Sequence, residues 1–169
     1  GEVAHRGPNR RSFELKLMAN IRRKLRGHGE FKVYTMQSTI YVEPESDGCD
    51  MDEAFERLKK VFGIISMSRA MACEKELDAI VETAVRYLGD AMEEAASFKV
   101  ETKRSDKSFP KTSIQVSQYV GGELAERFPE TRVDVHEPEL VVNVEIRDYA
   151  AYVHGNATPG AGGMPVGSN

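Results

Sequence analysis

Basic side chains gather around a phenylalanine in the middle of the chain. Residues 99–111 carry five of them: Lys99, Lys103, Arg104, Lys107 and Lys111. Phe109 lies among them and is followed by a proline. Lysine and arginine bind phosphate groups, and an aromatic ring stacks on an unpaired base, so this segment favours contact with single-stranded nucleic acid. In the alternative interpretation Phe109 packs in the core and only supports the loop.

The residues after this segment predict a helix over 112–127. The first turn of a helix has free backbone N–H groups that bind phosphate. Alternatively, the Thr112 hydroxyl caps the helix itself. The candidate RNA-binding residues of this region are Lys103, Arg104, Lys107, Phe109, Lys111 and Ser113.

A second basic group lies on a predicted amphipathic helix over residues 10–27. Apolar residues recur at every fourth position, which is the spacing of a buried helical stripe. This stripe consists of Phe13, Leu17, Ile21 and Leu25. The basic residues of this helix that we expect to bind RNA are Arg10, Arg11, Lys16, Arg22, Arg23 and Arg26.

The net charge of −4 conceals an uneven distribution of charge. Residues 1–35 hold nine basic and three acidic side chains, and residues 99–111 hold five basic and two acidic ones. The rest of the chain is acidic. Local fields, and not the net charge, attract a phosphate backbone, so two basic islands are compatible with a nucleic-acid partner. Ordinary solvated faces are the alternative.

Other residue types do not assemble a catalytic site in the sequence. Cys49 has acidic neighbours, which disfavour the thiolate that a nucleophile needs, and Cys73 follows an apolar segment that is typical of a core. The four histidines lack metal-binding spacing. The glycine-rich C-terminal stretch lacks the lysine of a phosphate-binding loop. We therefore expect no catalytic residue, no metal and no cofactor site in this chain.

The location of the protein can also be predicted from the sequence. No apolar run approaches the ~18–20 residues of a membrane span, and no secretory signal is visible, so we expect no membrane partner. With two cysteines, a disulfide framework is excluded, and a reducing cytoplasm is the expected compartment.

The first half of the chain predicts a small α+β domain. After the basic helix come strands over 31–34 and 39–42, and then a helix that starts at Asp50 or Asp52 and runs to about Phe62, with Phe62 facing inward. A strand over 64–72 follows. This order lacks only a first strand to be β-α-β-β-α-β, the ferredoxin-like motif. Residues 1–4 are expected to be the end of that strand.

The second half predicts another α+β unit. Helices are expected over 74–97 and 112–127, and strands over 98–103, 131–135, 140–147 and 149–153. From residue 155 onward the sequence is rich in glycine and uncharged, which is typical of a linker and not of a packed element. The expected domains are therefore residues 1–73 and 74–154, with a linker over 155–169.

Three motifs give the chain a resemblance to a known family. The opening GEVAHRGPNRRSFELKLMANIRRKL resembles that of tRNA 4-thiouridine synthases, also called tRNA sulfurtransferases or thiamine-biosynthesis proteins. FKVETKRSDKSFPKTS is similar to the signature of the THUMP domain, and residues 120–124 and 133–153 continue that similarity. GAGGMPVGSN is similar to the stretch that leads into the ATP-pyrophosphatase domain of the family.

The resemblance implies a fold and a function. It implies an N-terminal ferredoxin-like domain with an incomplete first strand, followed by a THUMP domain, which together hold the acceptor stem and 3′ end of tRNA. The family uses ATP in a third domain, receives sulfur from a cysteine desulfurase, forms homodimers and supplies sulfur for thiamine thiazole. This chain would then be the RNA-binding part, inactive alone and without a cofactor of its own.

Two other functions are compatible with the sequence. One is a THUMP unit of another tRNA-modifying enzyme, such as a methyltransferase. The other is a ferredoxin-like interaction protein that binds no RNA, which the negative net charge would suit.

Overall fold

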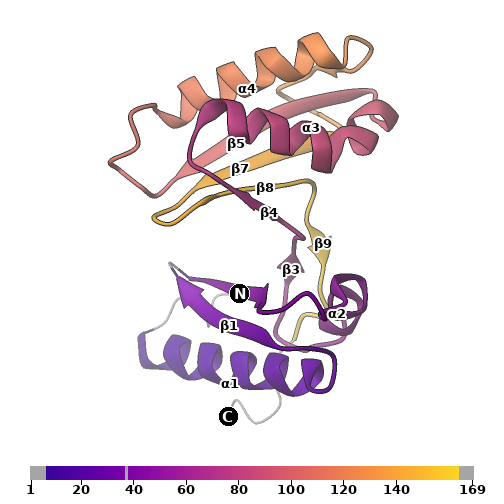
Figure 1. Ribbon diagram of the computed structural model, residues 1–169. Helices are drawn as coiled ribbons and strands as arrows, with labels where there is room; N and C mark the ends of the chain where they lie inside the picture. Colours follow the sequence, from indigo (N-terminus) through magenta and orange to yellow (C-terminus); the bar gives the residue numbers. More distant parts are fainter. Residues whose placement is uncertain (1–6, 37, 164–169) are drawn as a thin grey trace. The chain divides into compact units, whose positions relative to one another are not determined.

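The computed structural model describes residues 7–36 and 38–163, and these divide into two compact units (Figure 1). Unit 1 contains the described residues up to Met67 together with those from Ala157 onward, and unit 2 spans Ser68–Asn156. Three separate sheets are present among the described strands. The α+β class expected from the sequence is confirmed.

Unit 1 is built on a long helix, α1 (Gly7–Leu25), and a hairpin of β1 (Phe31–Met36) and β2 (Thr39–Pro44). The predicted apolar stripe of α1 is buried, because its side chains join Val33 and residues of the next helix in one cluster. The antiparallel register of the hairpin places Val33 opposite Val42. The strand predicted at residues 1–4 lies outside the described residues.

The second helix of unit 1, α2 (Met51–Leu58), is shorter than predicted. Asp50 is its N-cap and accepts a hydrogen bond from the Glu53 backbone N–H at 3.1 Å. The helix ends four residues before Phe62, and Phe62 is 56% exposed, so the prediction that Phe62 faces inward is wrong. Val61, the residue before it, is buried in its place.

The strand predicted over residues 64–72 is in fact two strands in different sheets. β3 (Ser66–Met67) pairs with β9 (Thr158–Pro159), and β4 (Met71–Cys73) pairs with β8 (Ala151–His154). Alternation of apolar residues continues through both, so the sequence pattern does not reveal the change of partner. Unit 2 therefore includes β4. The domain boundary predicted after residue 73 stays a prediction.

The glycine-rich stretch is packed where the structure describes it, which contradicts the expectation of an unpacked linker. Besides the β3–β9 pair, the Gly63 N–H donates to the Gly162 carbonyl, and the Gly162 N–H donates to the Ile64 carbonyl, both at 2.8 Å. A Cβ atom at Gly160 would lie 2.2 Å from the Ile64 carbonyl oxygen. Only glycine fits so close an approach of two backbones.

Unit 2 is a five-stranded sheet covered by two helices. The strand order is β4-β8-β7-β5-β6, in which β5 (Ser97–Arg104), β6 (Arg132–Val133) and β7 (Leu140–Ile146) are parallel and the other pairs are antiparallel. Figure 1 shows α3 (Leu77–Glu94) and α4 (Ser113–Arg127) on the same face of this sheet.

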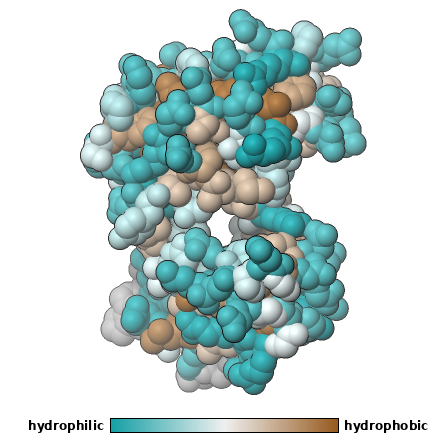
Figure 2. Space-filling model, viewed as in Figure 1, coloured by the Kyte–Doolittle hydropathy of each residue, from teal (hydrophilic) through white to brown (hydrophobic). Residues whose placement is uncertain are grey.

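The core of unit 2 lies between the sheet and these two helices. β7 shows the alternation of a strand with one packed face: Leu140, Val142, Val144 and Ile146 are buried, and the residues between them are half-buried. Phe98 of β5 is the largest fully buried side chain of the unit. The outer surface drawn in Figure 2 is mainly hydrophilic. In the described part of the chain, no helix combines the length and apolar character that crossing a membrane requires.

Candidate nucleic-acid interface

Two loops of unit 2 meet at one edge of its sheet. Because β5 and β7 are parallel, their carboxyl ends lie side by side, with the loop 105–112 after β5 and the turn 147–150 after β7. The backbone N–H groups of Ser105 and Asp106 both donate to the Ile146 carbonyl, at 2.9 and 3.2 Å. The sheet therefore fixes both loops at this edge, on the left of Figure 1.

Arg104 is engaged within the loop that it precedes. Its Nη1 donates to the backbone carbonyls of Asp106 at 3.4 Å, Lys107 at 3.2 Å and Phe109 at 3.2 Å. The guanidinium thus organises the loop from inside. Its predicted role as a phosphate ligand stays a prediction, and the structure adds this internal role to it.

A buried carboxylate holds the same loop from the other side. Asp106 accepts hydrogen bonds from Lys75 Nζ at 2.7 Å and from the Ser108 backbone N–H at 2.9 Å. These bonds, the one from Lys75 first, lower the pKa of Asp106 to about 2. Lys75 Nζ also donates to the Asp148 carbonyl at 2.6 Å, so one ammonium group links the loop to the turn 147–150. The sequence analysis did not single out Lys75, because no local spacing marks a contact across 31 residues.

The remaining basic residues of the loop are free to bind a ligand. Lys103, Lys107 and Lys111 are exposed, and the structure gives none of them a partner among the described residues. Lys103 lies on β5, and the other two lie in the loop. Three ammonium groups are thus presented at one edge of the sheet.

At both positions that the sequence left open here, the structure shows the structural alternative. Phe109 is half-buried and packs against the core of unit 2, as the structural interpretation required. Thr112 is the N-cap of α4 and forms a capping box with Gln115, whose backbone N–H donates to the Thr112 hydroxyl at 3.1 Å. Ser113, the first residue of α4, is half-buried. Its predicted contact with RNA stays a prediction.

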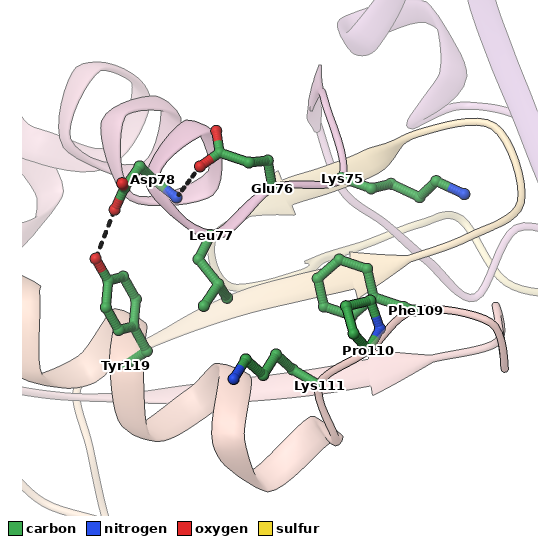
Figure 3. A pocket seen from close by; sticks show the side chains of 8 residues that line it. All are labelled: Lys75, Glu76, Leu77, Asp78, Phe109, Pro110, Lys111 and Tyr119. Atoms are coloured by element: carbon green, nitrogen blue, oxygen red, sulfur yellow. Dashed lines mark hydrogen bonds between the residues drawn. The ribbon is translucent and has the colours of Figure 1, made fainter.

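A shallow hollow of about 350 Å³ lies beside this loop (Figure 3). Its lining consists of Lys75, Glu76, Leu77, Asp78, Phe109, Pro110, Lys111 and Tyr119. Glu76 caps α3, and Asp78 accepts a hydrogen bond from the Tyr119 hydroxyl at 2.5 Å, which raises the pKa of Tyr119 to about 12. Because both carboxylates are occupied, the Lys111 ammonium group is the unpaired charge of the lining.

The basic residues predicted on the first helix are distributed over α1 in unit 1. Arg11, Arg22, Arg23 and Arg26 are exposed, and Arg10 and Lys16 are half-buried. Several already have partners.

Arg10 pairs with Glu14 at 3.1 Å, and Arg22 donates to the Val33 carbonyl at 2.9 Å. Arg23 donates to Asn20 at 2.7 Å. Arg22 and Arg23 lie in the last turn, where cations also stabilise the negative end of the helix dipole. Their binding to RNA stays a prediction.

The described residues contain no grouping of three or more histidine, cysteine or acidic side chains that could hold a metal ion. Cys49 donates its thiol to the Glu30 carbonyl at 3.0 Å. Cys73 is half-buried against the core of unit 2, and this burial raises the pKa of its thiol. Neither arrangement activates a nucleophile.

Comparison with known proteins agrees with this architecture. The family described as the ThiI ferredoxin-like domain matches residues 1–68, and the family described as the THUMP domain matches residues 74–154. A probable tRNA sulfurtransferase of Thermoanaerobacter pseudethanolicus is 44% identical over 169 residues, which cover 100% of this chain and 43% of that protein. One of Moorella thermoacetica is 41% identical over 167 residues, covering 99% of this chain and 42% of that protein.

A solved structure has the same fold. The crystal structure of a 4-thiouridine synthetase–RNA complex with bound ATP superposes with a TM-score of 0.83 at 26% identity, covering 99% of this chain and 42% of that one. The chain therefore belongs to the THUMP-domain proteins. More particularly, it carries the ferredoxin-like and THUMP domains of the ThiI family, and it spans less than half the length of the curated relatives that it matches.

Proposed function

We propose that this chain is the tRNA-binding region of a tRNA sulfurtransferase that makes 4-thiouridine in tRNA. The observation that carries the proposal is the edge of unit 2, where exposed Lys103, Lys107 and Lys111 surround a loop held by Arg104 and Asp106. The 4-thiouridine synthetase of the same fold was solved with RNA, which supports an RNA ligand. The match of residues 1–68 to the ThiI ferredoxin-like domain favours this enzyme over another THUMP-bearing one.

The task of the chain in this proposal is to position the substrate. Lysine side chains neutralise phosphates of the acceptor stem, and the loop and hollow beside them accommodate the single-stranded 3′ end. The basic side of α1, with Arg11 and Arg26 exposed and without described partners, supplies further phosphate contacts. Because the backbone of this loop is already fixed, the loop loses little conformational entropy when it binds a ligand.

The chemistry of sulfur transfer belongs to the longer protein. We include in the proposal ATP as its cofactor, a cysteine desulfurase as its sulfur donor, a homodimer as its assembly, a cytoplasmic location and a second role in thiamine thiazole synthesis. The ATP found in the related 4-thiouridine synthetase supports the first of these. This chain by itself would bind RNA without thiolating it.

The test is binding of an acceptor-stem RNA with a 3′ overhang at several salt concentrations. Lys103→Ala should weaken binding and flatten the slope of log K against log[salt] by roughly one unit or slightly less, because one phosphate contact is lost. Lys60→Ala, at an exposed lysine of unit 1 in an acidic stretch, is the matched control and should leave the slope unchanged. Absence of RNA binding at low salt would refute the proposal.

A further inference from the structure

The turn that joins β7 to β8 carries an aromatic side chain that lies almost entirely in solvent. Tyr149 is 88% exposed, the largest exposed fraction among the large apolar side chains of the described residues. No hydrogen bond or ring contact joins Tyr149 to another residue that the structure describes. Two other tyrosines of unit 2 have hydrogen-bond partners: Tyr87 donates to the Arg69 carbonyl, and Tyr119 donates to Asp78. Tyr149 is therefore a free ring surface.

The backbone beneath this ring is held in place. The Arg147 N–H donates to the Ala150 carbonyl at 3.0 Å, which closes the turn. Lys75 Nζ binds the Asp148 carbonyl at 2.6 Å and the Asp106 carboxylate at 2.7 Å. The residue before Tyr149 is thus tied to the lysine-bearing loop. An exposed ring on a fixed backbone loses little conformational entropy when it contacts a ligand.

The surroundings of Tyr149 define the chemistry of that ligand. Lys103, Lys107 and Lys111 are exposed at the same edge of the sheet, and they provide charge for phosphates. Phe109, the aromatic residue expected to stack on a base, is half-buried and packs against the core of unit 2. Among the aromatic rings of unit 2 that the structure describes, Tyr149 is the most exposed. Surfaces that bind single-stranded nucleic acid combine basic side chains, which contact the phosphates, with exposed aromatic rings, on which bases stack.

We propose that Tyr149 stacks on an unpaired nucleobase of RNA bound at this edge. The inference rests on the proposed function and adds to it a residue that distinguishes unpaired from paired nucleotides. A base in a duplex is covered by its neighbours on both faces, whereas an unpaired base offers a free face to the ring. Stacking tolerates any base, so Tyr149 selects single-stranded RNA without selecting a sequence.

The experiment compares two RNAs of the same duplex, one blunt and one with a four-nucleotide 3′ overhang that contains 2-aminopurine. Tyr149→Ala should weaken binding of the overhang RNA about 5- to 100-fold and leave the blunt duplex unchanged. Tyr149→Phe keeps the ring and should bind as the parent chain does. Tyr149→Leu keeps apolar bulk without an aromatic face and should behave as Tyr149→Ala.

Further readouts separate stacking from charge and from folding. The parent chain and Tyr149→Phe should quench the 2-aminopurine fluorescence, and Tyr149→Leu should not. The salt dependence of binding should keep its slope in all three variants, since no phosphate contact is lost. The thermal midpoint should also be unchanged, because the side chain is exposed.

Two negative results have different meanings. If the parent chain binds the overhang RNA and Tyr149→Ala binds it equally well, the inference is wrong and the proposed function stands. If the parent chain binds neither RNA at low salt, both fail. Equal loss of both RNAs in Tyr149→Ala would also overturn the inference, because it would show a contact that is not specific for unpaired bases.

Discussion

Arg104 belongs to a sequence motif that favours phosphate binding, and it also holds its own loop in place. The Lys-Arg pair at the end of β5 favours phosphate binding by type, yet the Arg104 guanidinium donates to three carbonyls of its own loop. An arginine has five N–H donors, so organising the loop leaves some of them for a ligand. The two members of the pair should therefore respond differently to mutation.

We expect Arg104→Ala to destabilise unit 2 by about 1–2 kcal/mol, because three backbone carbonyls lose their shared donor. Lys103→Ala should leave the free energy of unfolding within about 0.5 kcal/mol of the parent, as for an exposed side chain. Urea unfolding of both variants measures the difference. Equal stability of the two variants would contradict the internal role of Arg104.

Glu145 of β7 lies in a charged cluster with Arg147 and His154. Its Oε1 accepts from Arg147 Nε at 3.0 Å, and its Oε2 lies 2.9 Å from His154 Nε2. The side chain is 20% exposed. The hydrogen bond with His154, followed by that from Arg147, lowers the pKa of Glu145 from 4.5 to about 2 despite its burial.

This shift predicts a loss of stability in acid. The unfolded chain takes up a proton at Glu145 near pH 4.5, whereas the folded chain does so only near pH 2. The contribution of ionised Glu145 to the free energy of unfolding is therefore present above pH 4.5 and disappears as the pH falls toward 2. It is on the order of 2 kcal/mol. Asp106, whose pKa is also lowered to about 2, acts in the same direction.

Glu145→Gln should make the dependence of the unfolding free energy on pH shallower between pH 4.5 and 2. Glu126→Gln, at an exposed carboxylate of α4, is the control. Denaturant titrations at several pH values measure both slopes. An acid slope that is the same in Glu145→Gln and in the parent chain would show that the cluster does not contribute.

The candidate site was predictable from sequence only in part. The basic loop was found from composition, and Lys103, Lys107 and Lys111 are exposed as a binding role requires. Tyr149 was placed in the last strand, because its apolar neighbours continue the alternation of β8, and the structure places it in the turn instead. Lys75 was missed because its partners are distant along the chain, and pairing over such distances leaves no local pattern.

At the scale of elements, helices were predicted better than short strands. The four-residue spacing of apolar side chains in α1 and α3 is a property of the helix itself and survives in any environment. A strand such as β3 or β4 has two or three residues, and its identity depends on a partner elsewhere in the chain. The β3–β9 pair therefore emerged only from the structure.

The β3–β9 pair makes a prediction about glycine. Gly160→Ala should destabilise unit 1 by several kcal/mol, since the new methyl group would meet the Ile64 carbonyl at 2.2 Å and force the two backbones apart. Gly122→Ala is a matched control in α4, where no atom lies within 4 Å of the added group. That variant should be stabilised by about 0.5–1 kcal/mol, because alanine favours a helix interior.

Thermal unfolding followed by circular dichroism compares the two alanine variants directly. A Gly160→Ala chain as stable as the parent would mean that β9 is not closely packed on β3. A Gly122→Ala chain that loses stability would point instead to a general intolerance of added methyl groups.

In the molecule as a whole, the segment from Ala157 onward is part of unit 1, although it follows unit 2 in the chain. We expect a chain that ends at Asn156 to lose amide protection in the segment 63–67, since its hydrogen-bond partners beyond Asn156 are missing. The sheet of unit 2 contains no residue beyond His154 and should keep its protection.

Hydrogen exchange followed by mass spectrometry measures both units in one experiment. Loss of protection spread evenly over both units in the chain ending at Asn156 would contradict the assignment of the segment from Ala157 onward to unit 1. Retained protection at 63–67 would contradict it as well.

The return of the chain to unit 1 also sets an order for events on the ribosome. Unit 2 consists of one continuous stretch, so all of its residues are available once Asn156 has been synthesised. Unit 1 lacks Thr158, Pro159 and Gly162 until later, and cannot close the β3–β9 pair before they emerge. Domains usually complete their folding in the order in which they are translated. Here the unit that is started first is finished last, and the sheet edge that carries Lys103 and Lys107 can form while the N-terminal unit is still incomplete.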